Sequence, residues 1–475
     1  MKVPYSQFLL SEQDRLAEIV DLLEKRFDYA SILGTDSIVR DYEVRKTRSS
    51  IQDSHMTERG FVVRVCDKGR YAEYSFNKLP GGSLEAFYAE ITERLISGES
   101  DARFPCCVYP LPEEEILTST YAADVEILPG STGDDTILTR LTSIRDSGLA
   151  AESLLVDFAA TYTYGHISKC FVSSKKKLRQ SYVWSCGYIT PTIRKGDVTK
   201  WFYQSFSGLK GLELLDEIMG SIPEVISVVR ELLDSTPMIP GMYDVVCSPS
   251  VAGLIAHEAF GHGVELDMFV KNRAKAADYL GKPVASPLVS MRDGAATAKE
   301  VASYFFDDEG TLAGDTLVID RGLLKSGISD LLSALSMGLK PTGNGRRESF
   351  ERKTYSRMTN TVFGPGDSNP EDMISSIDHG FLLEHSLGGM EDPKNWGIQC
   401  SCIVAREIKA GKLTGKVFSP ALITGYVPDM LSSISMVSKD VDLSGSGSGH
   451  CGKGYKELAK VSAGGPFIKA KVRLG

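Results

Sequence analysis

The stretch from Ser248 to Asp267 reads SPSVAGLIAHEAFGHGVELD, and it begins in the way that a helix is expected to begin. Ser248 is one of the residue types that cap free backbone N–H groups, and Pro249 stands where a missing N–H costs nothing. Apolar residues then recur at helical spacing, which predicts that one face of this helix is buried. These residues are Val251, Leu254 and Ile255.

The same helix carries three side chains that are typical of a hydrolytic metal site, His257, Glu258 and His262. In the common motif His-Glu-x-x-His, the histidines are four residues apart and share one helix face. Here they are five residues apart, which separates them by roughly 140° around a regular helix. Gly261 could permit a π-bulge or a helix end that swings His262 back, and Gly263 offers a place for the helix to stop.

The competing interpretation is a core helix with two unrelated histidines, of which one packs and the other caps. The glutamate that follows His257, and the carboxylates of Glu265 and Asp267 just beyond His262, favour a metal site.

The composition is that of an ordinary globular protein of 475 residues, with 42% hydrophobic residues and a formal net charge of −9. This length suggests two domains or more. The acidic balance argues against direct nucleic-acid binding, which needs a cationic surface. One run, Lys175–Arg179, is basic, and we interpret it as a solvated hairpin end rather than a phosphate-binding site.

Residues 1–5 show no apolar run of the signal-peptide type, and no stretch approaches the ~20 continuous apolar residues of a membrane span. The nine cysteines are scattered without a disulfide framework. Neither the adjacent Cys106 and Cys107 nor the alternating Cys400 and Cys402 has the spacing of a redox or zinc pair. We therefore expect a cytoplasmic protein that is not associated with membranes.

Residues 1–236 are predicted to form an N-terminal α+β domain. An amphipathic helix is expected over residues 11–27, with Ser11 and Asp14 as a capping box, and strands follow between Tyr29 and Asn77. Four further strands suggest an antiparallel meander; they cover residues 154–162, 166–172, 181–189 and 200–206. The other predicted helices cover residues 84–95, 136–144, 212–219 and 224–233.

A domain boundary is predicted where Ser235-Thr236-Pro237 is followed closely by Pro240-Gly241. Residues 237–475 then form a C-terminal, β-rich domain that opens with a short strand, Tyr243–Cys247, leading directly into the helix with the histidines. The predicted fold class is therefore α+β.

Two loops of the second half carry charged side chains. Asp307–Thr311 places three carboxylates around a turn; they could hold a cation, but a capped turn before the strand Thr316–Ile319 is favoured. Thr342–Glu348 contains the paired Arg346 and Arg347. These arginines could bind a peptide carboxylate, and a surface loop with a salt bridge explains them equally well.

The glycine-rich stretch Ser444–Gly454 reads SGSGSGHCGKG. It lacks the ending of a phosphate-binding P-loop, and its Gly/Ser alternation would also suit a flexible linker. Yet Cys451, close to Lys453 in a glycine-rich loop, has the surroundings that a thiolate metal ligand needs. Sequence spacing alone cannot join Cys451 to the distant histidines.

At these residues the chain resembles the TldD/PmbA family, in particular its TldD-type branch. Residues 257–267 are similar to that branch's His-Glu-x-x-x-His signature with its acidic tail, although Leu266 replaces a glycine. Thr342–Glu348 resembles a Thr-Gly-Asn-x-Arg-Arg-Glu block. Further blocks follow in the family's order; they are Arg357–Asn360, Gly388-Gly389, Ile434–Val437 and Gly449–Lys453. The resemblance covers essentially the full chain.

The resemblance implies a zinc-dependent peptidase in which His257, His262 and Cys451 hold the metal and Glu258 is the acid–base residue. It also implies a dimer that encloses a chamber and acts on short or unfolded peptides. Relatives often pair with a PmbA-type (TldE) subunit that lacks the metal motif, so that a homodimer and a heterodimer are both open.

A second interpretation is a non-catalytic regulator of DNA gyrase or of a toxin system, with a purely structural zinc ion. In that case His450, beside the third ligand, would complete a closed set of four protein ligands. The presence of Glu258 argues for catalysis, because a structural site has no use for a base.

Overall fold

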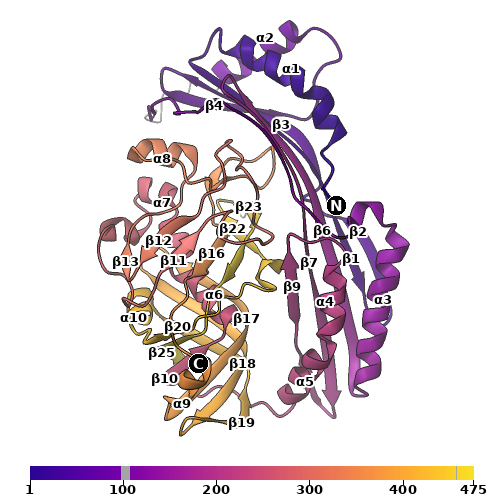
Figure 1. The fold of residues 1–475 in the computed structure, drawn as a ribbon, viewed down its shortest axis with the longest axis vertical. Coiled ribbons are helices and arrows are strands. Elements are labelled where there is room, and N and C mark those ends of the chain that lie inside the picture. The colour runs from indigo at the N-terminus through magenta and orange to yellow at the C-terminus, as the bar shows by residue number, and fades with distance from the viewer. Residues whose placement is uncertain (98–106, 456) are drawn as a thin grey trace.

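The computed structural model describes residues 1–97, 107–455 and 457–475 and consists of two halves that lie side by side (Figure 1). The first half is a long, curved, largely antiparallel sheet with helices, and the second half is rich in strands. The predicted α+β class is therefore confirmed. Cys106 lies outside the described residues.

The sheet of the first half has nine strands, with the central order β4-β3-β1-β6-β7-β5. Of the remaining strands, β2 pairs with β1, whereas β8 and β9 both pair with β7. The strands are β1 (Tyr29–Val44), β2 (Ser49–Asp53), β3 (Glu58–Asp67), β4 (Arg70–Phe76), β5 (Leu117–Ala122), β6 (Leu155–Ser173), β7 (Lys176–Lys195), β8 (Val198–Trp201) and β9 (Gln204–Gly208).

The predicted four-strand meander is wrong in its divisions. The two strands expected at 154–162 and 166–172 are one long strand, β6, and the strand expected at 200–206 is divided into β8 and β9. Gly165 does not interrupt β6, because a side chain there would lie 2.4 Å from the Trp184 ring on the neighbouring strand. This glycine therefore makes room for a tryptophan within the sheet.

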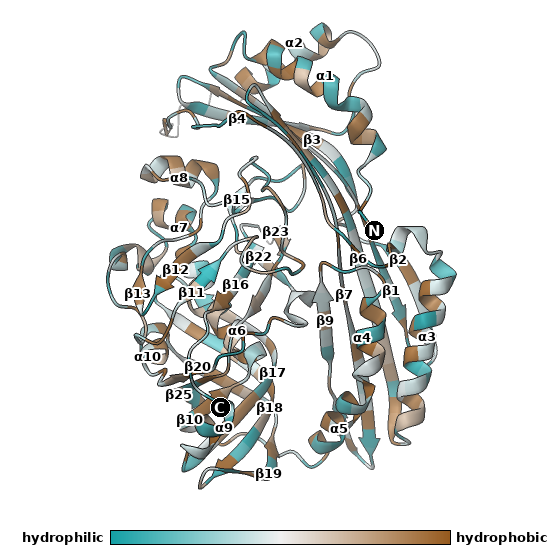
Figure 2. Cartoon of the chain, viewed as in Figure 1, coloured by the Kyte–Doolittle hydropathy of each residue, from teal (hydrophilic) through white to brown (hydrophobic). Residues whose placement is uncertain are grey.

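Helices cover both ends of this sheet (Figure 1). They are α1 (Gln7–Leu23), α2 (Leu84–Ser97), α3 (Asp134–Ala151), α4 (Leu214–Gly220) and α5 (Ile222–Leu232). Each shows both polar and apolar residues, as helices with one buried face do (Figure 2). The first helix begins earlier than predicted: Ser6 accepts a hydrogen bond from the Leu9 N–H at 3.1 Å, whereas Ser11 donates to a carbonyl inside the helix.

The second half contains a seven-stranded sheet and a five-stranded sheet. The first comprises β10 (Gly241–Cys247), β17 (His379–Asp392), β18 (Gly397–Lys409), β19 (Lys412–Phe418), β20 (Ala421–Tyr426), β21 (Met436–Val437) and β25 (Ile468–Leu474). The second comprises β11 (Met291–Asp293), β12 (Thr316–Asp320), β13 (Leu323–Leu324), β16 (Asn360–Phe363) and β24 (Ser462–Gly464).

Two short hairpins and five helices complete this half. The hairpins are β14 (Gly345–Arg346) with β15 (Tyr355–Ser356), and β22 (His450–Lys453) with β23 (Glu457–Lys460). The helices are α6 (Pro249–Ala256), α7 (Leu266–Val270), α8 (Leu331–Met337), α9 (Pro370–Ser375) and α10 (Val427–Ser432). Helix α6 contacts strands of both sheets, and its buried residues belong to the main apolar core of this half.

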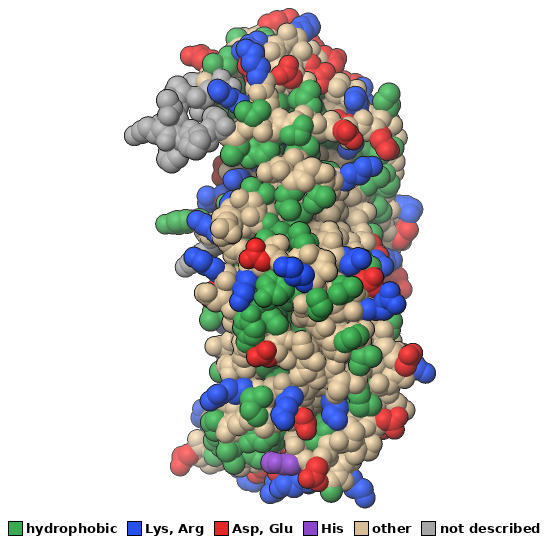
Figure 3. Space-filling view, turned by 90° about the vertical axis from the view of Figure 1, so that its left-hand side faces the viewer, with side chains coloured by type: hydrophobic (Ala, Val, Ile, Leu, Met, Phe, Trp, Pro, Cys, Tyr) green, Lys and Arg blue, Asp and Glu red, His purple; other side chains and the backbone are tan. Residues whose placement is uncertain are grey.

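The boundary predicted at 236/237 falls in the segment between α5 and β10. On the face drawn in Figure 3, acidic and basic side chains are interspersed rather than gathered by sign. Among the described residues, no helix combines the length and the apolar character that a membrane crossing requires.

Candidate metal centre

The helix with the two histidines changes its winding where they stand. Regular α-helix ends at Ala256, His257–Gly261 forms a π-helical turn, and His262–Val264 forms a 3₁₀ turn. Because a π-helix bonds residue i to residue i+5, residues five apart come onto nearly the same face. The ring centroids of His257 and His262 are accordingly 5.3 Å apart. Of the two adjustments considered at Gly261, a π-bulge and a helix end, the structure has the π-helical turn, which accounts for the five-residue spacing.

Close packing surrounds this irregular turn. At Gly261, a side chain would lie 2.0 Å from the Met358 sulfur, and at Gly253 it would lie 2.6 Å from the backbone of Gly464 in β24. Pro249 occupies the first turn as predicted. Ser248 takes the N-cap position, but its hydroxyl lies 3.2 Å from that of Ser250 and does not cap the helix.

The hairpin of β22 and β23 brings Cys451 to the two histidines. Its Sγ lies 3.2 Å from Nε2 of His262, although the two residues are 189 positions apart in the chain. One ligand atom from each of His257, His262 and Cys451 lies within 4.8 Å of the others. The structure thus brings together the three residues that were expected to hold a metal.

His450 lies apart from this cluster. Its Nε2 is 3.3 Å from the sulfur of Met56 in the first half, and His450 is not among the three clustered ligands. Adjacent residues of a strand point to opposite faces, so that Cys451 and His450 cannot easily turn toward the same ion.

Arg357 holds the backbone of the cysteine in place. This arginine is only 1% exposed, and it donates to the carbonyl groups of Cys451 and of Glu457. In the sequence, Arg357 stands out only as part of a family block, because nothing in its local pattern reveals which carbonyls it reaches.

The electrostatics of the cluster favour a thiolate. Burial would raise the pKa of Cys451, but hydrogen bonds and charge from His257 and His262 outweigh it and lower the pKa to about 5. Burial would likewise lower the pKa of His262, whereas Cys451 and Glu265 raise it well above its ordinary value. The thiolate is the form of cysteine that binds metals.

A second layer of charged residues supports His262. Its Nδ1 lies 3.4 Å from Oε2 of Glu265, and the same oxygen accepts a hydrogen bond from Nζ of Lys453 at 2.9 Å. Lys453 also donates to Asp267 at 2.6 Å. A carboxylate on the second nitrogen of a ligating histidine fixes the orientation of the ring. This is the part played by the acidic tail of the motif.

Glu258 lies beside the cluster and is buried, and this burial raises the pKa of its carboxyl group. It packs against Gly389 of β17, where a side chain would lie 2.6 Å from Cγ of Glu258. A glycine at 389 is therefore required for this carboxylate to lie where it does.

A cavity of about 540 Å³ adjoins His257 and Glu258. Its walls come from β17, from the glycine-rich stretch 442–450 and from residues 203–205 of the first half. That stretch is no free linker: Gly445 has a φ of 73° and lies against the Ser205 carbonyl, and the Gly447 N–H donates to Ser207 at 3.0 Å. The cavity therefore lies between the two halves of the chain.

The carboxylates of Asp307–Thr311 form a turn, as favoured from the sequence. Asp307 accepts hydrogen bonds from the backbone N–H groups of Glu309 and Thr311, each at 2.9 Å, and also from that of Gly345. Burial and the neighbouring Glu309 raise the pKa of Asp307 to about 8.

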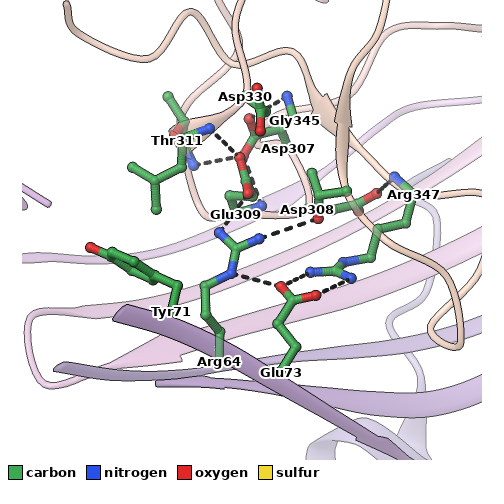
Figure 4. Close-up of polar contacts among 12 residues, drawn as sticks. Arg64, Tyr71, Glu73, Asp307, Asp308, Glu309, Thr311, Asp330, Gly345 and Arg347 are labelled. Carbon is green, nitrogen blue, oxygen red and sulfur yellow. Dashed lines mark hydrogen bonds and ion pairs between the residues drawn. The ribbon is translucent and has the colours of Figure 1, made fainter. Parts of the chain in front are cut away.

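The paired arginines lie near this turn and away from the large cavity. Arg347 forms an ion pair with Glu73 of β4 (Figure 4). Arg64 of β3 forms two ion pairs, one with Glu73 at 2.7 Å and one with Glu309 at 2.5 Å. Arg346 donates to the Met358 carbonyl at 2.7 Å. Neither arginine lines the cavity beside His257. Arg347 thus bridges the two halves, whereas Arg346 contacts its own half, and their substrate-binding role stays a prediction.

Two imidazoles and a thiolate around one point, with a carboxylate and a cavity beside them, define a candidate site for metal-dependent hydrolysis. The model of the PmbA/TldA metallopeptidase C-terminal domain matches residues 240–471. A metalloprotease of Synechocystis sp. is 31% identical over 481 residues, which is 96% of each chain. The chain belongs to the TldD/PmbA family.

Other relatives match mainly the second half. A metalloprotease of Methanocaldococcus jannaschii is 35% identical over 49% of this chain, and the chain spans 51% of that relative's length. A zinc metalloprotease TldD homolog of Saccharolobus solfataricus is 29% identical over 60% of this chain and 62% of its own. The crystal structure of TldE from Thermococcus kodakarensis has the same fold, with a TM-score of 0.73, 18% identity and coverage of 96% and 99%.

Proposed function

We propose that this protein is a zinc-dependent peptidase in which His257, His262 and Cys451 hold the metal and Glu258 is the acid–base residue. The observation that carries the proposal is the convergence of three ligand atoms within 4.8 Å, next to a buried carboxylate that borders a cavity of about 540 Å³. Relatives named metalloproteases and a zinc metalloprotease support the same class.

The donor set fits zinc. Imidazole nitrogen and thiolate sulfur are ligands that zinc prefers, and the buried Nδ1 of His257 has no hydrogen-bond partner among the described residues. Three protein ligands are typical of catalytic zinc sites, whereas structural sites use four. Because His450 lies against Met56, the described residues supply three, which argues against the structural alternative.

A zinc ion would supply Lewis-acid chemistry, because it polarises a carbonyl group and acidifies water. Glu258, whose carboxyl pKa is raised by burial, accepts a proton from the attacking water and donates it to the leaving amine nitrogen. Glu265 and Lys453 hold His262 in orientation throughout.

Strand β17 offers a binding edge for an extended peptide. Its partner β10 pairs only with residues 380–383, and residues 384–389 border the cavity. A peptide that adds to this edge would be held mainly through its backbone, which explains a preference for short or unfolded chains without a strict sequence requirement.

We further propose an N-terminal domain of residues 1–236, a C-terminal peptidase domain of residues 237–475, and a cytoplasmic dimer that encloses the site in a chamber. The partner is a second copy or a TldE-type subunit, since TldE shares this fold. All eight cysteines within the described residues are free, which suits a reducing compartment.

The test is the variant Glu258→Gln, which keeps the shape of the side chain and removes its basicity. We expect about one zinc ion per chain in both proteins and cleavage of an unstructured peptide by the wild type only. Asp442→Asn, which changes another carboxylate of the cavity wall, is the matched control. Turnover by Glu258→Gln would contradict the assigned role. Zinc without cleavage, followed by cleavage when a TldE-type subunit is added, would identify the heterodimer.

A further inference from the structure

We propose that the end of the cavity formed by Tyr203, Glu224 and Glu384 is a subsite for a basic side chain, lysine or arginine, of the peptide substrate. This inference rests on the proposed peptidase function. It specifies the substrate class, which a bare peptide-binding edge would leave open.

The charge of the cavity is the first argument. Its lining, within the part of the chain that the structure describes, contains four carboxylates and no lysine or arginine; the carboxylates are Glu224, Glu258, Glu384 and Asp442. Glu224, on α5, is exposed and forms no ion pair with any described residue. A cationic side chain therefore meets attraction in this cavity, and an acidic one meets repulsion.

The neighbouring charges do not cancel this field. Arg406 is shared between Glu384, at 2.6 Å, and Glu231, and Glu224 also acts on the neighbouring His385, so that this end of the cavity has three carboxylates and one guanidinium group. His385 adds no charge near neutral pH, because burial lowers its pKa to about 4. The local balance at this end of the cavity remains negative.

Aromatic rings are the second argument. Tyr203 lines the cavity, and Trp201 stacks on it with ring centroids 6.3 Å apart and an angle of 20° between the rings. Trp201 is 49% exposed, and it extends the aromatic surface toward solvent. Aromatic faces attract ammonium and guanidinium groups, and the apolar stems of lysine and arginine pack along such rings.

Contacts between the halves place these groups together. The Tyr203 hydroxyl donates to the Ser386 carbonyl at 2.6 Å, and Phe202 packs edge-on against His385 with centroids 4.7 Å apart. The charge of Glu224 acts on His385. The aromatic pair of the first half and the acidic end of β17 therefore form one subsite.

The course of β17 sets the distance from this subsite to the reacting bond. Gly389 touches Glu258, and Glu384 lies five residues earlier on the same strand. Because β17 has a bulge between Ser386 and Gly388, Glu384 and Gly389 lie opposite residues only four apart on β18, Val404 and Cys400, which at about 3.3 Å per residue is roughly 13 Å. A substrate strand that follows this edge would thus present its basic side chain about four to five residues from the scissile bond.

The experiment compares unstructured peptides that carry Lys, Gln or Glu at one position, moved from three to six residues on either side of the scissile bond. We expect kcat/KM to be about tenfold higher for Lys than for Gln at one position four or five residues away, and lower for Glu. In Glu224→Gln and Trp201→Ala, the Lys-to-Gln ratio should fall to about 2, whereas Asp442→Asn should retain most of it. A ratio that stays near ten in the double variant Glu224→Gln/Trp201→Ala would overturn the subsite.

Two further measurements separate this inference from its alternatives. The preference should survive acetylation of the peptide N-terminus; its loss would show that the α-amino group is the bound cation. Binding of the same labelled peptides to zinc-loaded Glu258→Gln, followed by fluorescence anisotropy, reports on the subsite even if no peptide is cleaved. Equal affinity for Lys and Glu peptides there would refute the subsite, whereas selective binding without wild-type cleavage would refute only the peptidase activity.

Discussion

The metal centre and the charged network at the interface are both polar and assembled from distant segments. In the network, Arg64 and Arg347 meet the carboxylates of Glu73 and Glu309, so that the charges neutralise one another (Figure 4). In the centre, the donor atoms of His262 and Cys451 converge with His257 on one point beside a cavity. Charged groups that pair with one another stabilise the fold. Ligand atoms that converge on one point beside a cavity are instead placed to bind a metal ion.

The largest difference between the two clusters is expected at Cys451. We expect Cys451→Ala to lose its zinc and to cleave peptide only at background level, a larger loss than the roughly 10–100-fold that removal of a supporting partner costs. Zinc content per chain and initial cleavage rates measure this. Cys402→Ala, at a buried cysteine of β18 outside the cluster, is the matched control and should retain its zinc. One zinc ion and full activity in Cys451→Ala would refute the ligand set.

A substitution in the charged network should lower the free energy of unfolding without affecting metal binding. Arg64→Met leaves the buried Glu309 without its cation, whereas Glu73 keeps Arg347, and the stranded Glu309 charge should cost about 3–5 kcal/mol of unfolding free energy. The matched control is Arg26→Met in the exposed pair with Asp67, for which we expect about 1 kcal/mol or less. Urea denaturation measures both. An equal effect of the two substitutions, or loss of zinc from folded Arg64→Met, would contradict the distinction between the clusters.

Glu300 also lies at the interface but, unlike the carboxylates of the network, has no ion-pair partner among the described residues. It accepts a hydrogen bond from Ser207 at 3.0 Å. Burial raises its pKa to about 7. A raised folded-state pKa means that the stability due to the protonated group is complete below the ordinary value of 4.5 and is lost as the pH rises through 7. Relative to wild type, Glu300→Gln should therefore gain about 2.5 kcal/mol between pH 5 and pH 8.

Urea unfolding of wild type and Glu300→Gln at pH 5 and pH 8 gives the difference in unfolding free energy between the two proteins at each pH. The titration of all other groups cancels when these two differences are compared. The control is Glu12→Gln, which removes a partly exposed carboxyl group paired with Arg15 in place of a buried one. A constant difference between wild type and Glu300→Gln would show that this carboxyl group is ionised throughout.

The smallest expected effect concerns the support of His262. Glu265→Gln keeps the shape of the side chain but removes the charge that faces His262 and Lys453, which should weaken zinc binding about 10–100-fold without abolishing it. Competition with a chelator measures the affinity. Glu391→Gln, beside the Gly263 N–H, is a control at a second carboxyl near the same turn. Unchanged affinity in Glu265→Gln would show that the ring is oriented by packing alone.

Local patterns predicted those features that depend on local forces. The five-residue spacing with Gly261 predicted the π-helical turn, and the carboxylates around Gly310 predicted a turn, because both depend on the nearest backbone. The helix start was misplaced, since Ser6 and Ser11 are equally good caps in isolation. The break predicted between residues 162 and 166 was wrong, because Gly165 continues the strand and the Trp184 ring that it accommodates lies across the sheet.

Long-range partners could not be predicted in this way. The pairing of Arg347 with Glu73 joins residues 274 positions apart, and no periodicity connects them. Cys451 was assigned to the metal only through resemblance to a family, because its own loop also suited a linker. The place of His450, against Met56, likewise depends on how the halves pack.

The separation of 189 residues between His262 and Cys451 has a consequence for chain topology. An ion held by both residues is a cross-link that closes a long loop, and the entropy of closing such a loop grows only slowly with its length, by about 0.6 kcal/mol per doubling. Folding of the second half already includes this loss of entropy before an ion binds. Metal binding should therefore occur only once this half has folded. When a chelator removes the ion, we expect the β22–β23 hairpin to detach before the helix with the histidines is disturbed.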